Sequence, residues 1–264
     1  MMIDREQVKN IFRKYTNAYD STNVKVKLKI AHTYRVAGLC EQIARSENLP
    51  IEEVELAWLL GMLHDVGRFE QLRRYDTFND AESVDHAKLG AEILFGSENK
   101  IRDYIKDGAE DSLLETAIMT HNAYRLPEEL DERTERFCHV LRDADKIDIL
   151  RVNAETPLEE IYNTTIEDVQ NAVVTEAVMD NFFAHRATPR QIKQNPVDHL
   201  VGHISLVYEL VFSESLRIVK NDGYLEKLLQ FESRNPQTQK QFIALRREME
   251  HYLNVSKKNS KGRF

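Results

Sequence analysis

Glycine and proline are scarce in this chain, at nine and six among 264 residues. Tight β-hairpins usually need these residues, so few hairpins can be present and long helices are favoured. The two cysteines, Cys40 and Cys138, stand in apolar, helix-like surroundings without a metal-ligand spacing, and we expect buried thiols. No apolar run approaches the ~18 residues of a membrane span, and the charged N-terminus is unlike a secretory signal. The sequence therefore predicts a cytoplasmic protein without a membrane partner.

The charge balance narrows the class of partner. Lys and Arg total 36 against 44 Asp and Glu, for a net charge of −8. Binding to a nucleic-acid backbone needs clustered positive side chains, so bulk nucleic acid is a poor partner. A small anionic substrate would instead need a local positive site. Hydrophobic residues make up 42% and charged residues 30%, which is typical of a globular protein.

Apolar residues recur at intervals of three and four, which predicts an all-α chain. We expect a helical domain over 1–155 and a C-terminal helical extension over 156–264, packed on it as part of the same globule. The segment 67–85 loses the periodicity and is expected to be a long loop, a kind of segment that is often functional. The expected helices are 4–20, 24–47, 51–65, 86–95, 113–121, 127–151, 198–220 and 236–254.

Six residues in the first 150 are candidate metal ligands, and they lie on or beside the expected helices. They are His32, His64, Asp65, His86, His121 and Asp145. A single buried histidine is more often a core residue, and one His-Asp pair is expected by chance. Burying several imidazoles and carboxylates without partners costs several kcal/mol, whereas a shared cation satisfies all of them. Such a donor set suits Fe, Mn, Ni, Zn or Mg, and the lack of thiolates argues against structural zinc.

The order of these residues resembles that of the HD-domain superfamily of metal-dependent phosphohydrolases over roughly residues 25–155. The superfamily's defining pattern, H…HD…D, is matched by His32, His64-Asp65 and Asp145. The resemblance implies that these residues bind one divalent metal ion. It also implies that His86 and His121 add a second ion, with Asp65 as the bridge. The superfamily's fold is an all-α bundle, which agrees with the periodicity.

The resemblance further implies hydrolysis of a small phosphoester or phosphoanhydride by a metal-activated water, with nucleotides as the leading substrate class. The segment HDVGR, residues 64–68, is similar to the HDxGK of members that cleave cyclic dinucleotides, with Arg68 in place of lysine. The GYP signature of that subgroup is absent, so its substrate is not transferred.

Phosphate chemistry also needs fixed cations, and the nearest candidates are Arg35, Arg68 and Lys146. We predict that the catalytic residues are Asp65, Arg68 and Lys146. We also predict that Arg35, Arg68 and Lys146 contact the substrate. Arg35 and Lys146 could equally be solvated or ion-paired helix residues. Arg73 and Arg74 follow on the same expected loop. Asn122 is a further candidate substrate contact and could orient His121 through a hydrogen bond.

Several alternatives stay open. His199 and His203 are spaced as HxxxH and could bind zinc on one helix face, although ordinary helix packing is favoured because no HExxH is present. Some HD-type relatives with the same six ligands are mixed-valent di-iron oxygenases, and a metal-containing sensory or binding module is a third possibility. A homo-oligomer is compatible with the sequence.

Overall fold

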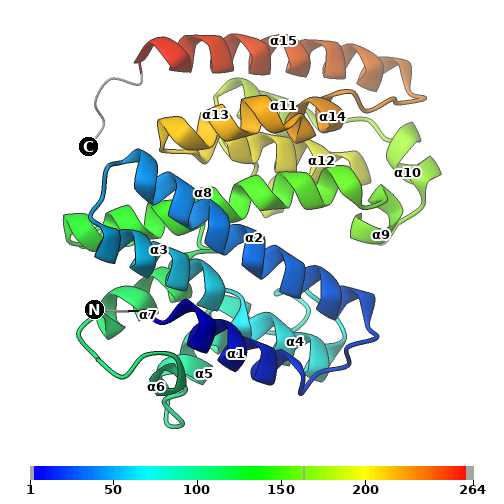
Figure 1. The fold of residues 1–264 in the computed structure, drawn as a ribbon. Helices are drawn as coiled ribbons and strands as arrows, with labels where there is room; N and C mark the ends of the chain where they lie inside the picture. Colours follow the sequence, from blue (N-terminus) through cyan, green and yellow to red (C-terminus); the bar gives the residue numbers. More distant parts are fainter. Residues whose placement is uncertain (1–2, 163, 260–264) are drawn as a thin grey trace. The chain divides into compact units, whose positions relative to one another are not determined.

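The computed structural model describes residues 3–162 and 164–259, and within these ranges every regular element is a helix (Figure 1). The expected all-α fold is therefore confirmed. The chain divides into two compact units, Met1–Ala144 and Asp145–Phe264. The division falls inside the long helix α8 (Glu132–Glu155), whereas the sequence placed it after residue 155.

Within residues 3–144, the first unit contains seven complete helices and the beginning of α8. The complete helices are α1 (Arg5–Thr16), α2 (Val24–Ser46), α3 (Ile51–Leu63), α4 (Val66–Tyr75), α5 (His86–Phe95), α6 (Ile101–Tyr104) and α7 (Asp111–Thr120). Helix α2 has the buried stripe that the periodicity predicts, including Val36, Cys40 and Ile43. Helix α3 is buried on nearly every side, as its apolar sequence requires.

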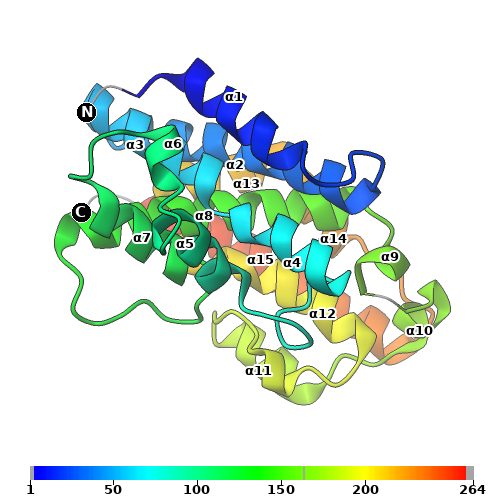
Figure 2. The same ribbon diagram turned by 90° about the horizontal axis from the view of Figure 1, so that it is seen from below.

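Helices α2 and α3 approach each other closely at Gly61. A Cβ atom at this position would lie 2.6 Å from the Cα of Ala37, so the contact admits no side chain. Helices α4 and α5 meet in the same way at Gly67, where a Cβ would lie 2.2 Å from the carbonyl oxygen of His86. Figure 2 shows α4, α5 and α7 in succession, and their contacts place α5 between the other two. These close approaches bring distant parts of the sequence together.

The prediction of a loop over 67–85 was wrong in its first half, because α4 extends to Tyr75. Phe69 and Leu72 are buried one turn apart, and Asp76 ends the helix in a left-handed conformation with φ 52°. The charges that obscured the helical pattern are neutralised locally. Glu70 accepts hydrogen bonds from Arg73 and Arg74, each at 2.5 Å. Residues 76–85 then form the loop.

The second unit contains the remainder of α8 and a set of mostly shorter helices. They are α9 (Leu158–Tyr162), α10 (Ile166–Asn171), α11 (Glu176–Phe183), η1 (Arg190–Ile192), α12 (Pro196–Ile204), η2 (Ser205–Glu209), α13 (Ser213–Asp222), α14 (Tyr224–Leu229) and α15 (Pro236–Asn259). The expected helix over 198–220 is broken between α12 and α13. Leu200, Ile204, Phe242 and Leu245 belong to the core of this unit.

Candidate metal centre

Four histidines of the first unit converge on Asp65. His32 lies within α2, His64 and Asp65 form the junction of α3 with α4, His86 begins α5, and His121 follows the last residue of α7. All five side chains are buried. The apolar helix α3 thus delivers the His-Asp pair to the interior, and the neighbouring helices supply the other imidazoles.

The histidines form two pairs, one at each carboxylate oxygen of Asp65. The Nε2 atoms of His32 and His64 lie 3.4 and 3.5 Å from Oδ2, and 3.3 Å from each other. The Nε2 atoms of His86 and His121 lie 3.5 and 3.8 Å from Oδ1, and 3.0 Å from each other. Asp65 therefore stands between two groups of three possible ligands, each group sharing its carboxylate.

The ring nitrogens that point away from the centre have acceptors. The Nδ1 atom of His64 donates to the carbonyl of Gly61 at 2.8 Å, and that of His121 donates to the carbonyl of Ile118 at 2.7 Å. The Nδ1 atom of His86 donates to the Asp80 carboxylate at 2.6 Å. Acceptors at this position fix the tautomer and the orientation of a metal-binding imidazole. The Nε2 atoms of these three rings are thereby left to face the centre with their lone pairs.

This arrangement fits a divalent cation. Burial, together with the charge of Arg68, lowers the pKa of His86 to about 4, so its ring is neutral at neutral pH. The Nε2 lone pairs of His86 and His121 then face each other across 3.0 Å, which is unfavourable without a positive ion between them. Two nitrogens at such a separation can both lie about 2.1 Å from one ion, the usual metal–imidazole distance.

Asp65 is ionised despite its burial. Burial alone would raise the pKa of its carboxyl, but Lys29, the neighbouring histidines and Arg68 hold this pKa well below its usual range. The Lys29 ammonium lies 2.6 Å from Oδ2, and Nε of Arg68 lies 3.7 Å from Oδ1. The sequence interpretation missed Lys29. Its position one turn before His32, on the same face of α2, is the signal that could have identified it.

Asp80 is a second carboxylate that the sequence interpretation missed. Its Oδ1 accepts from Arg68 and from Gln71, each at 2.8 Å, and its Oδ2 accepts from His86 at 2.6 Å and from Asn122 at 3.3 Å. Burial would raise the pKa of this carboxyl, but His86 and Arg68 lower it below its usual range. Asp80 thus fixes a candidate ligand and a candidate substrate contact together.

Arg68 lies beside the centre, on a helix and not on the loop that we expected. Its Nη1 donates to Asp80 at 2.8 Å and to the carbonyl of Phe78 at 2.7 Å. Its Nε is buried and has no hydrogen-bond partner among residues 3–162 and 164–259. This N–H group near Asp65 is therefore available to a further acceptor. Arg73 and Arg74 are instead paired with Glu70.

Asn122 does not orient His121, contrary to the sequence interpretation. Its amide donates to Asp80 at 3.3 Å and to Asp85 at 3.0 Å, while His121 is held by a backbone carbonyl. The exposed Asn122 side chain therefore supports the carboxylate that orients His86. Its contact with a substrate stays a prediction.

Three predicted residues stand in other settings. Arg35 lies one turn beyond His32 on α2 and is half-buried. Asp145 and Lys146 are the first residues of the second unit, on α8. Lys146 is buried and lies 3.3 Å from Glu209. The ligand role of Asp145 and the substrate contacts of Arg35 and Lys146 stay predictions.

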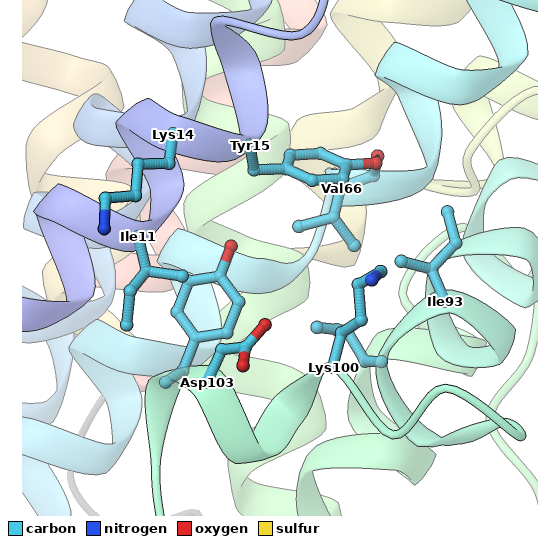
Figure 3. A pocket seen from close by; sticks show the side chains of 9 residues that line it. Ile11, Lys14, Tyr15, Val66, Ile93, Lys100 and Asp103 are labelled. Carbon is cyan, nitrogen blue, oxygen red and sulfur yellow. The ribbon is translucent and has the colours of Figure 1, made fainter.

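A cavity of about 430 Å³ in the first unit is distinct from the histidine cluster, since none of the six predicted ligands lines it (Figure 3). Lys14, Lys100 and Asp103 contribute charged groups to its wall. Tyr15 connects the cavity wall to the centre, because its hydroxyl donates at 2.8 Å to the carbonyl of Val66, the residue after Asp65.

Comparison with known protein families gave a match for one segment of the chain. Residues 30–150 match the family model of the HD domain. Comparison with curated proteins and with solved structures gave no match. None of the helices in the described ranges has the length and apolar character needed to span a membrane. HD domains bind divalent metals, in agreement with the paired histidines around Asp65. Residues 30–150 of this chain thus match an HD domain, and the match covers a little less than half of its 264 residues.

Proposed function

We propose that this protein hydrolyses a small phosphoester or phosphoanhydride, with nucleotides as the leading substrate class. The observation that carries the proposal is the division of four Nε2 atoms into two pairs, one at each oxygen of Asp65. A site with two neighbouring cations suits displacement at phosphorus better than a site for a single structural ion does.

Two ligand groups share the bridging carboxylate in this proposal. His32 and His64 would hold one ion with Asp65, and His86 and His121 would hold the other with the same carboxylate. Asp145 is proposed as an additional ligand from the superfamily pattern. When bound, divalent ions activate water near neutral pH and offset the negative charge of phosphate oxygens.

The chain's own cations orient the substrate. Arg68 is held by Asp80 and keeps its Nε–H beside Asp65, so it is placed to donate to a phosphate oxygen. Lys29 lies on the other side of the same carboxylate, 2.6 Å from Oδ2, and adds a second positive charge. Both side chains are largely buried, and their charges therefore act more strongly than they would in water. Lys146 and Arg35 are proposed as further phosphate contacts.

The test measures metal content and turnover on the same preparation. Protein purified without added metal is analysed for its elements and then assayed with a panel of nucleotides and p-nitrophenyl phosphates in the presence of Mn, Fe, Ni or Mg. We expect His64→Ala to lose both bound metal and turnover. His251→Ala, on the exposed side of α15, should retain both.

Two outcomes would contradict the proposal. One is the absence of hydrolysis with every metal, and the other is a turnover that His64→Ala does not change. Substrate-dependent oxygen uptake by iron-loaded protein would assign the centre to the oxygenase class instead. Ligand binding without any turnover would assign it to a sensory or binding module.

A further inference from the structure

The second unit contains a cluster of basic side chains around α12 and Tyr162. The Tyr162 ring lies against both histidines of α12, with centroids 5.6 Å from His199 and 5.7 Å from His203. Its hydroxyl lies 3.0 Å from Nδ1 of His203. Among the described residues, no carboxylate or thiol joins the two histidines as a metal ligand. The HxxxH spacing therefore does not make a metal site.

Lys193 lies directly on α12. A Cβ at Gly202 would be only 2.6 Å from both Cε and Nζ of Lys193, so the glycine leaves the space that the lysine side chain occupies. No hydrogen-bond acceptor or ion-pair partner of Nζ is found in residues 3–162 and 164–259. Burial and the nearby Arg190 lower the pKa of this ammonium group. Lys193 is thus a half-buried cation without a counter-ion in that part of the chain.

The nearby acidic group is already occupied. Asp198 acts on both Lys193 and His199 through its charge. Its two oxygens accept hydrogen bonds at 2.6–2.9 Å, and the donors are the backbone and hydroxyl of Thr175 and the backbones of Gln194 and Asn195. Asp198 therefore ties together loops of this unit and offers no ion pair to the ammonium group. A half-buried ammonium group without an ion-pair partner has an unmet need for an anion.

We propose that Lys193 and His199, with the nearby and exposed Arg190, bind the phosphate group of a small molecule in the second unit. An ammonium group offers three donors, a guanidinium offers a planar fork, and a protonated imidazole offers a further N–H, while phosphate presents several acceptor oxygens. Bound phosphate would favour the charged forms of Lys193 and His199. This proposal does not rest on the proposed hydrolysis, because it uses none of the residues assigned to that reaction.

The test uses the full chain treated with a chelator, so that phosphate bound through metal ions does not contribute. Inorganic phosphate and adenosine 5′-monophosphate are titrated by calorimetry, and the histidine ring signals are followed by NMR, with His199→Gln used to assign the His199 signal. We expect both ligands to shift the His199 signal. Similar affinities would assign the site to the phosphate group alone, and tighter nucleotide binding would assign it to a phosphorylated molecule.

Two variants and a control locate the site. Lys193→Gln should weaken binding by about tenfold or more, as expected for the loss of one charged hydrogen bond. Gly202→Ala keeps every charge but displaces the lysine, and it should weaken binding in the same direction. Lys220→Gln removes an exposed lysine of the same unit and should leave the Kd unchanged. Unchanged affinity in both test variants, or no binding to the wild-type protein at millimolar phosphate, would overturn the proposal.

Discussion

The two units each contain a cluster of buried or half-buried histidines, but the clusters differ in what surrounds the rings. In the first unit, the rings face an ionised carboxylate, and acceptors behind three of them fix Nδ1 as the donor. In the second unit, His199 and His203 lie against an aromatic ring, and their charged neighbours include Lys193. Only the first arrangement has the ligands and the electrostatics of a metal centre.

This difference shows that the spacing of histidines along a helix is a weak guide to metal binding. His199 and His203 have the ideal separation of four residues, whereas the four histidines around Asp65 come from four separate helical segments. What matters is a shared carboxylate, together with acceptors that fix the far nitrogens of the rings, as they do for three of the four here. Variants that remove these features one at a time test how much each contributes to metal binding.

Removing the shared carboxylate should have the largest effect. In Asp65→Asn, both ligand groups lose a charged oxygen, and we expect kcat to fall by about a thousandfold, or about 4 kcal/mol of transition-state stabilisation. The amount of bound metal, measured by elemental analysis, and the turnover should fall together. Asp168→Asn, an exposed carboxylate of the second unit, is the control and should keep both properties. Full activity in Asp65→Asn would remove the basis for the distinction between the clusters.

Removing an acceptor behind a ring should have a smaller effect. Asp80→Asn weakens the hold on Nδ1 of His86 and removes the ion pair with Arg68, so we expect metal affinity or activity to fall by about 10- to 100-fold. Asp76→Asn is a matched control, because it is exposed near the start of the same loop and asparagine tolerates its left-handed conformation. Titration with metal should give a lower affinity for Asp80→Asn than for Asp76→Asn. Equal metal affinities would show that the acceptor is dispensable.

Removing a cation beside the centre should cost less again. Lys29→Gln leaves the ligands in place but removes a charge 2.6 Å from Asp65, and we expect kcat/KM to fall by about tenfold. Lys25 lies one turn earlier on α2 and is exposed, so Lys25→Gln is the control and should behave as wild type. Steady-state kinetics at several substrate concentrations separates the two. A normal kcat/KM in Lys29→Gln would place this lysine outside the catalytic site.

The smallest effect is a pH dependence of stability in the second unit. Burial, with Lys193 and His199 nearby, lowers the pKa of His203 to about 3 from its usual 6.5. The unfolded chain therefore binds this proton more readily, and the stability due to neutral His203 is present above pH 6.5 and is lost as the pH falls toward 3. Between pH 6.5 and 5.5 we expect a loss of up to about 1 kcal/mol.

Urea unfolding at the two pH values measures this loss. His203→Gln should show a weaker dependence on pH than the wild-type protein, while its unfolding midpoint at pH 7 is compared as a control for general damage. Parallel curves for the two proteins would mean that His203 does not titrate in this range on unfolding. The burial of neutral His203 would then not contribute to the pH dependence of stability.

The sequence predicted the helices with clear periodicity and missed the segment in which charge interrupted it. Helices α2, α3 and α5 lie where their apolar stripes indicated. The sequence predicts a loop for α4 after Val66, because within residues 67–75 only Phe69 and Leu72 continue its apolar stripe among charged neighbours. The prediction of a single helix over 198–220 was wrong for the opposite reason. Its apolar pattern continues, but the backbone changes to η2 and then leaves the helix before α13.

The amino-acid sequence is enough to predict the all-helical class and to identify the histidines and the carboxylate that meet in the first unit. It does not predict that these histidines divide into two pairs, or that Lys29 and Asp80 lie beside them, because both features depend on how the helices pack. The physical reason is that periodicity reports which face of a helix is buried but not how two helices are aligned. That alignment depends on close contacts such as those at Gly61 and Gly67, where a missing side chain lets one backbone approach another.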